Sequence, residues 1–160
     1  MLYKFKMLFP KKKDFMREYE VLATNSLYDF HLAIQQDLDY DEAQMVAFYT
    51  ADENWSPVDG FTLFPTSETQ LMDEISLRNL IQKKQYRLLY YFDLMNKRSF
   101  QLEWQDLGEE KPRVLYPRRA DGKGEPPIQF RESKETDQSF FSDAMPDIDF
   151  AASAGEGGDD

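Results

Sequence analysis

The sequence contains no cysteine and only one histidine, His31. Without cysteine there is no disulfide, no thiol nucleophile and no cysteine-ligated zinc or iron–sulfur site. One imidazole is too few for a histidine-rich metal site or for most catalytic triads. No apolar run approaches the roughly 18 residues that a transmembrane helix needs. The sequence therefore favours no catalytic role, and we expect no cofactor, no bound metal and no membrane association.

Positive charge is also scarce, because 19 Lys and Arg residues stand against 30 Asp and Glu residues. This balance does not favour binding to a nucleic-acid backbone, which needs a basic surface. Hydrophobic residues make up 41% of the chain and aromatic residues 15%, which is enough for one domain with a core. Residues 1–10 alternate lysines with apolar residues instead of following a basic head with an unbroken apolar run. This pattern predicts a strand rather than a signal peptide, so we expect a cytoplasmic protein.

The negative charge is concentrated at the C-terminal end of the chain. The 29 residues of 132–160 hold 9 acids and 1 base, a net charge of −8, whereas the first 131 residues hold 21 acids and 18 bases, a net charge of −3. A small-residue, glycine-rich run follows at 151–158. We therefore predict a folded domain over residues 1–130 and an acidic, disordered tail over residues 131–160.

Apolar periodicity predicts five strands, at residues 1–10, 15–22, 45–50, 86–92 and 100–104. Short edge strands are candidates at 61–64 and 113–116, and the Gly- and Pro-rich stretch 121–127 is predicted as a surface loop. Ser26 followed by Asp29 has the spacing of a capping box, and helical spacing continues to Leu38. Ser76 can cap a second helix that runs to about Lys84.

These elements predict an α+β domain with a mainly antiparallel or mixed sheet of five to six strands and two helices on one face. The opening order of hairpin, helix and strand is compatible with a β-grasp-like start. Burying each large apolar side chain contributes roughly 1.5–3 kcal/mol. We place the heart of the core at seven side chains of the two strong strands: Tyr86, Leu88, Tyr90, Phe92, Phe100, Leu102 and Trp104.

The order of elements and several short motifs resemble the plasmid pRiA4b ORF-3-like family, over about residues 3–130. The matching segments are Leu27 to Gln35, Phe48, Trp55, Leu89 to Asp93, Tyr116-Pro117, Gly124 and Pro126-Pro127. The resemblance implies a small bacterial or archaeal α+β protein with no established biochemical activity. Some relatives are described as passengers of mobile elements, a label of gene neighbourhood that implies no recombinase activity.

The chain departs from this family where many members carry two acids, an aromatic residue and a histidine together. Only Asp93 of that set is present, and residues 94–100 contain no second acid and no histidine. The resemblance therefore implies that any metal or acid–base site at this place is lost. A pocket around His31, Trp55 and Asp93 stays open as an alternative, and it would belong to a metal-dependent or hydrolytic enzyme.

Two groups of charged residues in predicted turns are further candidates for binding sites. The acids Asp37, Asp39, Asp41 and Glu42 lack the glycine of a calcium loop at its sixth position, so we interpret them as a solvated turn. The bases of 11–13, 97–98 and 118–119 could form a small basic patch, but scattered turn charges explain them equally well. A nucleic-acid-associated factor linked to mobile elements is a second alternative.

The C-terminal segment 139–150 interleaves large apolar residues with acids, a composition typical of segments that dock into a groove. Its candidate partner-binding residues are Phe140, Phe141, Ile148 and Phe150. The leading hypothesis is a non-catalytic interaction module that binds an unidentified protein partner through its folded surface and this segment. The alternative for these phenylalanines is packing against their own domain. The sequence leaves the partner, the process and the oligomeric state open.

Overall fold

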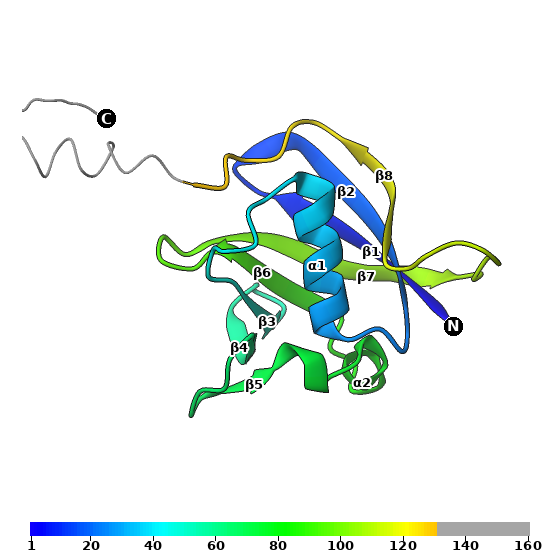
Figure 1. Ribbon diagram of the computed structural model, residues 1–160, viewed down its shortest axis with the longest axis horizontal. Helices are drawn as coiled ribbons and strands as arrows, with labels where there is room; N and C mark the ends of the chain where they lie inside the picture. The colour runs from blue at the N-terminus through cyan, green and yellow to red at the C-terminus, as the bar shows by residue number, and fades with distance from the viewer. Residues whose placement is uncertain (131–160) are drawn as a thin grey trace, which may run out of the picture. The chain divides into compact units, whose positions relative to one another are not determined.

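The computed structural model of the protein describes residues 1–130 (Figure 1). Within this range the chain forms eight strands, two α-helices and one short 3-10 helix. In chain order they are β1 (Leu2–Phe9), β2 (Lys12–Leu22), α1 (Leu27–Leu38), β3 (Ala47–Ala51), β4 (Pro57–Thr62), β5 (Thr69–Leu71), η1 (Met72–Glu74), α2 (Leu77–Gln82), β6 (Arg87–Asp93), β7 (Arg98–Gly108) and β8 (Arg118–Lys123). None of the described helices is both long enough and apolar enough to cross a bilayer.

All eight strands belong to one mixed sheet in the order β5-β4-β3-β6-β7-β1-β2-β8. The pair β4–β5 is parallel and every other adjacent pair is antiparallel. The prediction of five to six strands is therefore wrong. The β-grasp-like start is wrong as well, because a β-grasp pairs its first strand in parallel with a late strand, whereas β1 is antiparallel to both β2 and β7.

The strands that the sequence analysis did not predict lie at the two edges of the sheet. The predicted edge strand at 113–116 does not form, and β8 instead occupies 118–123, partly inside the predicted loop. Five of the six residues of β8 are exposed, and β5 has only three residues, so neither edge strand shows the apolar alternation that marks a half-buried strand. A polar edge strand has no such pattern in its sequence.

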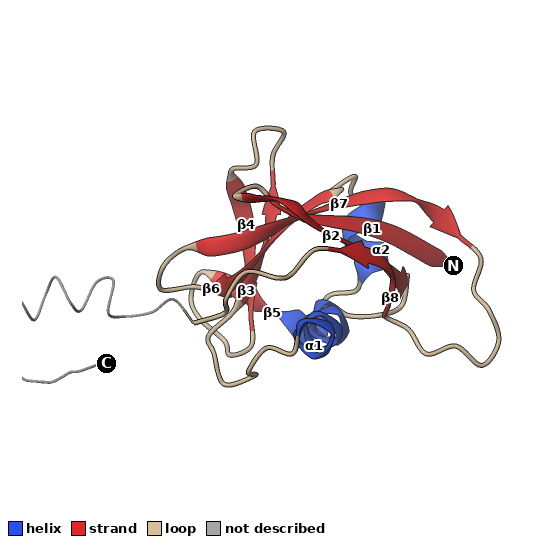
Figure 2. Cartoon of the chain, turned by 90° about the horizontal axis from the view of Figure 1, so that it is seen from above, coloured by secondary structure: helices blue, strands red, loops and turns tan. Residues whose placement is uncertain are grey.

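Both predicted helix starts are confirmed. Ser26 and Asp29 form a reciprocal capping box at α1, and Ser76 does the same with Asn79 at α2. These caps satisfy backbone N–H groups that have no partner inside the helix. α1 lies against one face of the sheet (Figure 2). Leu77 and Leu80 of α2 join the same hydrophobic core as the buried residues of α1.

The core between α1 and the sheet is rich in aromatic rings. Phe92 and Phe100 lie 4.6 Å apart between ring centroids, and Phe48 lies 4.7 Å from Tyr90. Of the seven predicted core side chains, five are buried and Trp104 packs partly buried against them. Tyr86 is the exception, since it is 37% exposed and stacks on Trp104 from outside.

A short segment after β8, residues 127–129, ties the loop that follows α1 to the start of β7, and we call it the strap. Tyr40 donates a hydrogen bond from its hydroxyl to the carbonyl of Pro127. The Gln129 side chain accepts from the N–H of Asp41 at 2.6 Å and donates to the Asp41 carbonyl at 2.8 Å. Arg98 donates to the Ile128 carbonyl at 2.7 Å. The strap thus joins parts of the chain that are far apart in sequence.

Replacement of Phe92 with alanine tests this core against a matched surface change. Phe92 is fully buried, so Phe92→Ala should lower the free energy of unfolding by about 3–5 kcal/mol through lost burial and a residual cavity. Phe64 is 77% exposed, and Phe64→Ala should change it by less than about 0.5 kcal/mol. Urea unfolding followed by circular dichroism measures both. Equal midpoints for the two variants would contradict the packing described above.

Candidate interaction surface

His31 lies on α1 and is buried against the middle of the sheet. Its Nδ1 atom is 2.7 Å from the hydroxyl of Tyr90 on β6, which also accepts a 2.7 Å hydrogen bond from the Nε2 of Gln35. Burial lowers the pKa of His31 to about 4, so the imidazole is neutral at neutral pH. Burial also raises the pKa of the Tyr90 phenol. The three side chains form a polar contact inside the core, the helix–sheet triad.

Trp55 and Asp93 make separate structural contacts. The Arg87 guanidinium lies over the Trp55 ring, with its central carbon 5.5 Å from the ring centroid. Asp93 is buried and accepts hydrogen bonds from the backbone N–H and the side-chain amide of Asn96. It also forms an ion pair with Arg98 at 3.3 Å. The Asp93 carboxylate therefore stabilises the turn that joins β6 to β7.

The structure does not bring His31, Trp55 and Asp93 together. Arg87, which contacts Trp55, begins β6, and Asp93 ends it. Six residue steps along a strand span about 20 Å, so Trp55 and Asp93 lie towards opposite ends of β6. Within residues 1–130, no three His, Asp or Glu side chains are grouped as metal ligands. Phe140, Phe141, Ile148 and Phe150 lie outside the described residues.

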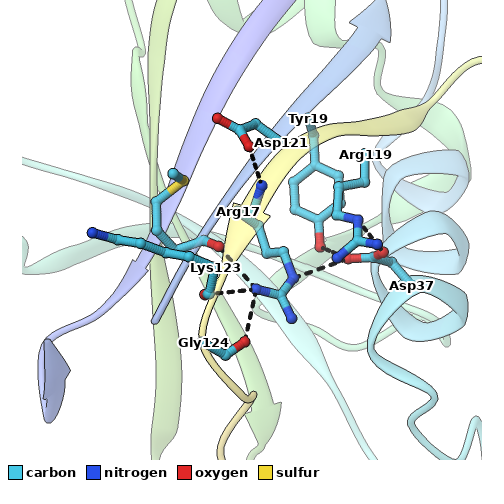
Figure 3. A network of polar contacts seen from close by, with 9 residues as sticks. Arg17, Tyr19, Asp37, Arg119, Asp121, Lys123 and Gly124 are labelled. Atoms are coloured by element: carbon cyan, nitrogen blue, oxygen red, sulfur yellow. Dashed lines mark hydrogen bonds and ion pairs between the residues drawn. The ribbon is translucent and has the colours of Figure 1, made fainter. Parts of the chain in front are cut away.

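The densest polar network of the described chain connects β2, β8 and α1 (Figure 3). The Nη1 of Arg17 donates to three backbone carbonyls, those of Met16 at 2.9 Å, Lys123 at 2.9 Å and Gly124 at 3.1 Å. The Nε of Arg17 lies 3.5 Å from Asp37 Oδ2, which is within ion-pair range but lacks hydrogen-bond geometry. Arg17 thereby holds the end of β8 to β2.

Asp37, near the end of α1, contacts side chains from both β2 and β8. The Tyr19 hydroxyl donates to its Oδ2 at 2.8 Å, and the Nε of Arg119 lies 3.1 Å from its Oδ1 (Figure 3). Burial and the neighbouring Asp37 charge raise the pKa of Tyr19, so its hydroxyl keeps its proton and donates. Asp37 is thus a partly buried ion-pair partner, which the interpretation of 37–42 as a solvated turn missed. The missed signal was Arg17 at an inward position of a predicted strand, because a buried charge needs a partner.

β8 is the last strand of the sheet, and β2 is its neighbour within residues 1–130 (Figure 1). Arg118 forms an ion pair with Glu20 of β2 at 2.9 Å. Gly122 allows close approach, because a Cβ atom there would lie 2.8 Å from the Cδ of Arg17. The far edge of β8 faces away from β2 and has no strand beside it in the described chain. An unpaired edge is a template for a further strand.

The outward face of the sheet is hollowed next to β8. A depression of about 210 Å³ is lined by Lys4, Phe5, Glu18, Tyr19, Glu20, Gln105 and Ala120. It lies where β7 and β8 are both bulged, at Gln105 opposite the Lys4–Phe5 step and at Ala120 opposite the Glu18–Tyr19 step. Bulges bend strands and re-aim their side chains. The depression therefore lies on the sheet face directly beside β8.

Comparison with known proteins supports the architecture. A model of the plasmid pRiA4b ORF-3-like protein family matches residues 3–129. A search of curated proteins found no match. A crystal structure of a protein of unknown function from Methanosarcina mazei Go1 is similar with a TM-score of 0.64 and 18% identity, over 76% of this chain and 68% of that chain. This likeness shows a shared fold.

The pKa of His31 predicts an acid-sensitive fold. An unfolded histidine titrates near 6.5, whereas burial lowers the folded value to about 4. As pH falls below about 6.5, the unfolded state therefore takes up the proton first, and this part of the stability is lost progressively down to about pH 4. The full loss amounts to about 3 kcal/mol. His31→Gln should show a flatter pH dependence than the parent chain.

Proton NMR can follow this titration directly, because His31 is the chain's single histidine. A measured pKa below 5 agrees with a buried, neutral ring. A value near 6.5 in the folded protein would contradict the burial of His31 against Tyr90.

Removing the negative charge of Asp37 should destabilise the β2–β8 edge. Asp37→Asn keeps an acceptor for Tyr19 but leaves Arg17 buried without a counter-charge, so the free energy of unfolding should fall by about 3 kcal/mol. Asp73→Asn makes the same chemical change at an exposed position and should cost less than about 0.5 kcal/mol. Chemical denaturation measures both. Equal losses in the two variants would show that Arg17 does not depend on Asp37.

Proposed function

The chain belongs to the plasmid pRiA4b ORF-3-like protein family, and we propose that it is a non-catalytic interaction module that binds a protein partner. One observation carries this proposal. The side chains best suited to chemistry, His31 and Asp93, lie apart, and each makes polar contacts that stabilise the fold. The sheet, in contrast, ends in the strand β8, whose outer edge has no neighbouring strand in the described chain. Such an edge is a recognised means of binding other chains.

The sequence adds a second recognition element to this surface. Residues 139–150 interleave Phe140, Phe141, Ile148 and Phe150 with acids. Large aromatic and aliphatic side chains supply most of the binding energy at protein interfaces, and neighbouring charges favour particular partners. We assign the partner contacts to these four side chains together with the folded surface.

The enzyme alternative has less support from the geometry. It needs His31, Trp55 and Asp93 in one site, and their contacts lie apart on and beside β6. The nucleic-acid alternative needs a basic surface free to bind phosphates. Four of the arginines in residues 1–130, Arg17, Arg98, Arg118 and Arg119, already form ion pairs with carboxylates.

Affinity capture tests the interaction proposal. The full-length chain should retain a partner from host lysate, and the purified partner should bind the purified chain again. A full-length variant with serine at positions 140, 141, 148 and 150 should bind that partner at least about tenfold more weakly, because hot-spot side chains typically contribute 2 kcal/mol or more. The matched control changes four small residues in the same segment or directly after it: Ser139→Ala, Ser142→Ala, Ala151→Ser and Ala152→Ser.

Two results would count against the proposal or restrict it. If no captured protein binds the purified chain again, the interaction proposal fails. If the partner binds the parent chain and the four-serine variant equally, recognition belongs to the folded surface, and the assignment of the four apolar side chains is wrong.

A further inference from the structure

The edge of β8 has the rigidity that strand addition needs. Arg17 fixes the carbonyls of Lys123 and Gly124, and Arg118 and Arg119 pair with Glu20 and Asp37. The strand is therefore anchored from behind at both ends, through β2 and α1. An anchored edge loses little conformational entropy when a further strand pairs with it, which favours binding.

The charge of this edge indicates its occupant. β8 carries Arg118, Arg119 and Lys123 against one acid, Asp121. Lys123 lies opposite Met16 near the start of β2, and the exposed Lys11 and Lys13 lie shortly before Met16 in the chain. Lys123 is exposed and has no ion pair among residues 1–130. Arg118 and Arg119 are already paired with Glu20 and Asp37, so Lys123 is the basic side chain of β8 that is left to meet an acid of a partner.

A second copy of the chain fits this edge poorly when the two strands pair along their full length. Two β8 strands paired antiparallel about the Ala120–Asp121 bond would place Arg118 opposite Lys123 of the other copy. This like-charge pair would occur twice by symmetry, and like charges directly opposite each other destabilise a sheet. The edge therefore favours an acidic strand over itself.

We propose that β8 binds an extended acidic segment of a protein partner as a ninth strand of the sheet. This inference rests on the proposed interaction function and names the surface and chemistry of the partner. Backbone hydrogen bonds along β8 supply affinity, and the exposed Lys123 selects an acidic residue. Asp121 opposes binding twice, because it adds a negative charge and its carboxylate accepts the Gly122 N–H at 2.8 Å.

The test uses the full-length chain and a labelled nine-residue peptide that alternates glutamate with valine and threonine, followed by fluorescence anisotropy. Two control peptides separate the contributions: one carries glutamine for glutamate, and the other carries N-methyl groups on alternate backbone nitrogens. The acidic peptide should bind, and both controls should bind at least about fivefold more weakly. N-methylation removes the backbone donors that pair strands and leaves the charge unchanged.

Protein variants locate the site. Lys123→Glu should weaken binding of the acidic peptide about fivefold, and Lys83→Glu, the same change at an exposed position on α2's C-cap, should leave it unchanged. Asp121→Ala should strengthen binding about threefold, whereas Asp73→Ala should not. All four changed side chains are exposed, so their melting temperatures should match that of the parent chain.

Three outcomes would overturn the inference. Equal binding of the N-methylated peptide would show charge attraction without strand addition. Equal effects of Lys123→Glu and Lys83→Glu would place the peptide elsewhere. A dimer that Lys123→Glu strengthens would show that a second copy occupies the edge. The proposed function stands separately, because a captured partner that binds the purified chain supports it even if this peptide fails.

Discussion

A guanidinium group keeps its proton in a protein interior, so Arg17 brings a permanent positive charge to the face of β2 that α1 covers. Three carbonyls and the Asp37 carboxylate surround that charge. Two of the carbonyls belong to the end of β8, and the carboxylate belongs to α1. Compensating one buried charge therefore sets the position of the edge strand relative to both the sheet and the helix. The proposed binding edge exists because this compensation holds it in place.

The helix–sheet triad has a related role at the centre of the domain. His31 and Gln35 lie one turn apart on α1, and both meet the Tyr90 hydroxyl. Apolar packing alone tolerates small rotations of a helix, whereas two hydrogen bonds to one atom fix its rotation and its position along the sheet. The Oε1 of Gln35 is buried without a partner, which is a cost of this arrangement. His31, the residue whose chemistry best suits catalysis, thus has a structural role.

The sequence predicted those features that depend on local pattern. The two capping boxes and the long strands with inward aromatic residues follow from spacing that any sheet or helix imposes. The family was identified separately, by the resemblance of short motifs. The polar edge strands β5 and β8 were not predicted, because exposed residues in a strand need not alternate between apolar and polar. The role of Asp37 depends on Arg17 and Arg119, which lie on two different strands, and sequence spacing does not show which carboxylate a buried arginine will meet. The separation of Trp55 from Asp93 likewise depends on which end of β6 each one contacts.

The order of strands in the sheet affects how this protein is made. β1 lies between β2 and β7, and Leu2 pairs with Gly108 across 106 positions of sequence. At a synthesis rate of about 5–20 residues per second, the ribosome needs roughly 5–20 s to deliver β7 after β1. During this interval neither β1 nor β2 has its second neighbour, because β8, which pairs with β2, is made even later than β7. The apolar side chains of β1 and β2 therefore stay without their second sheet neighbours until the last strands have been made.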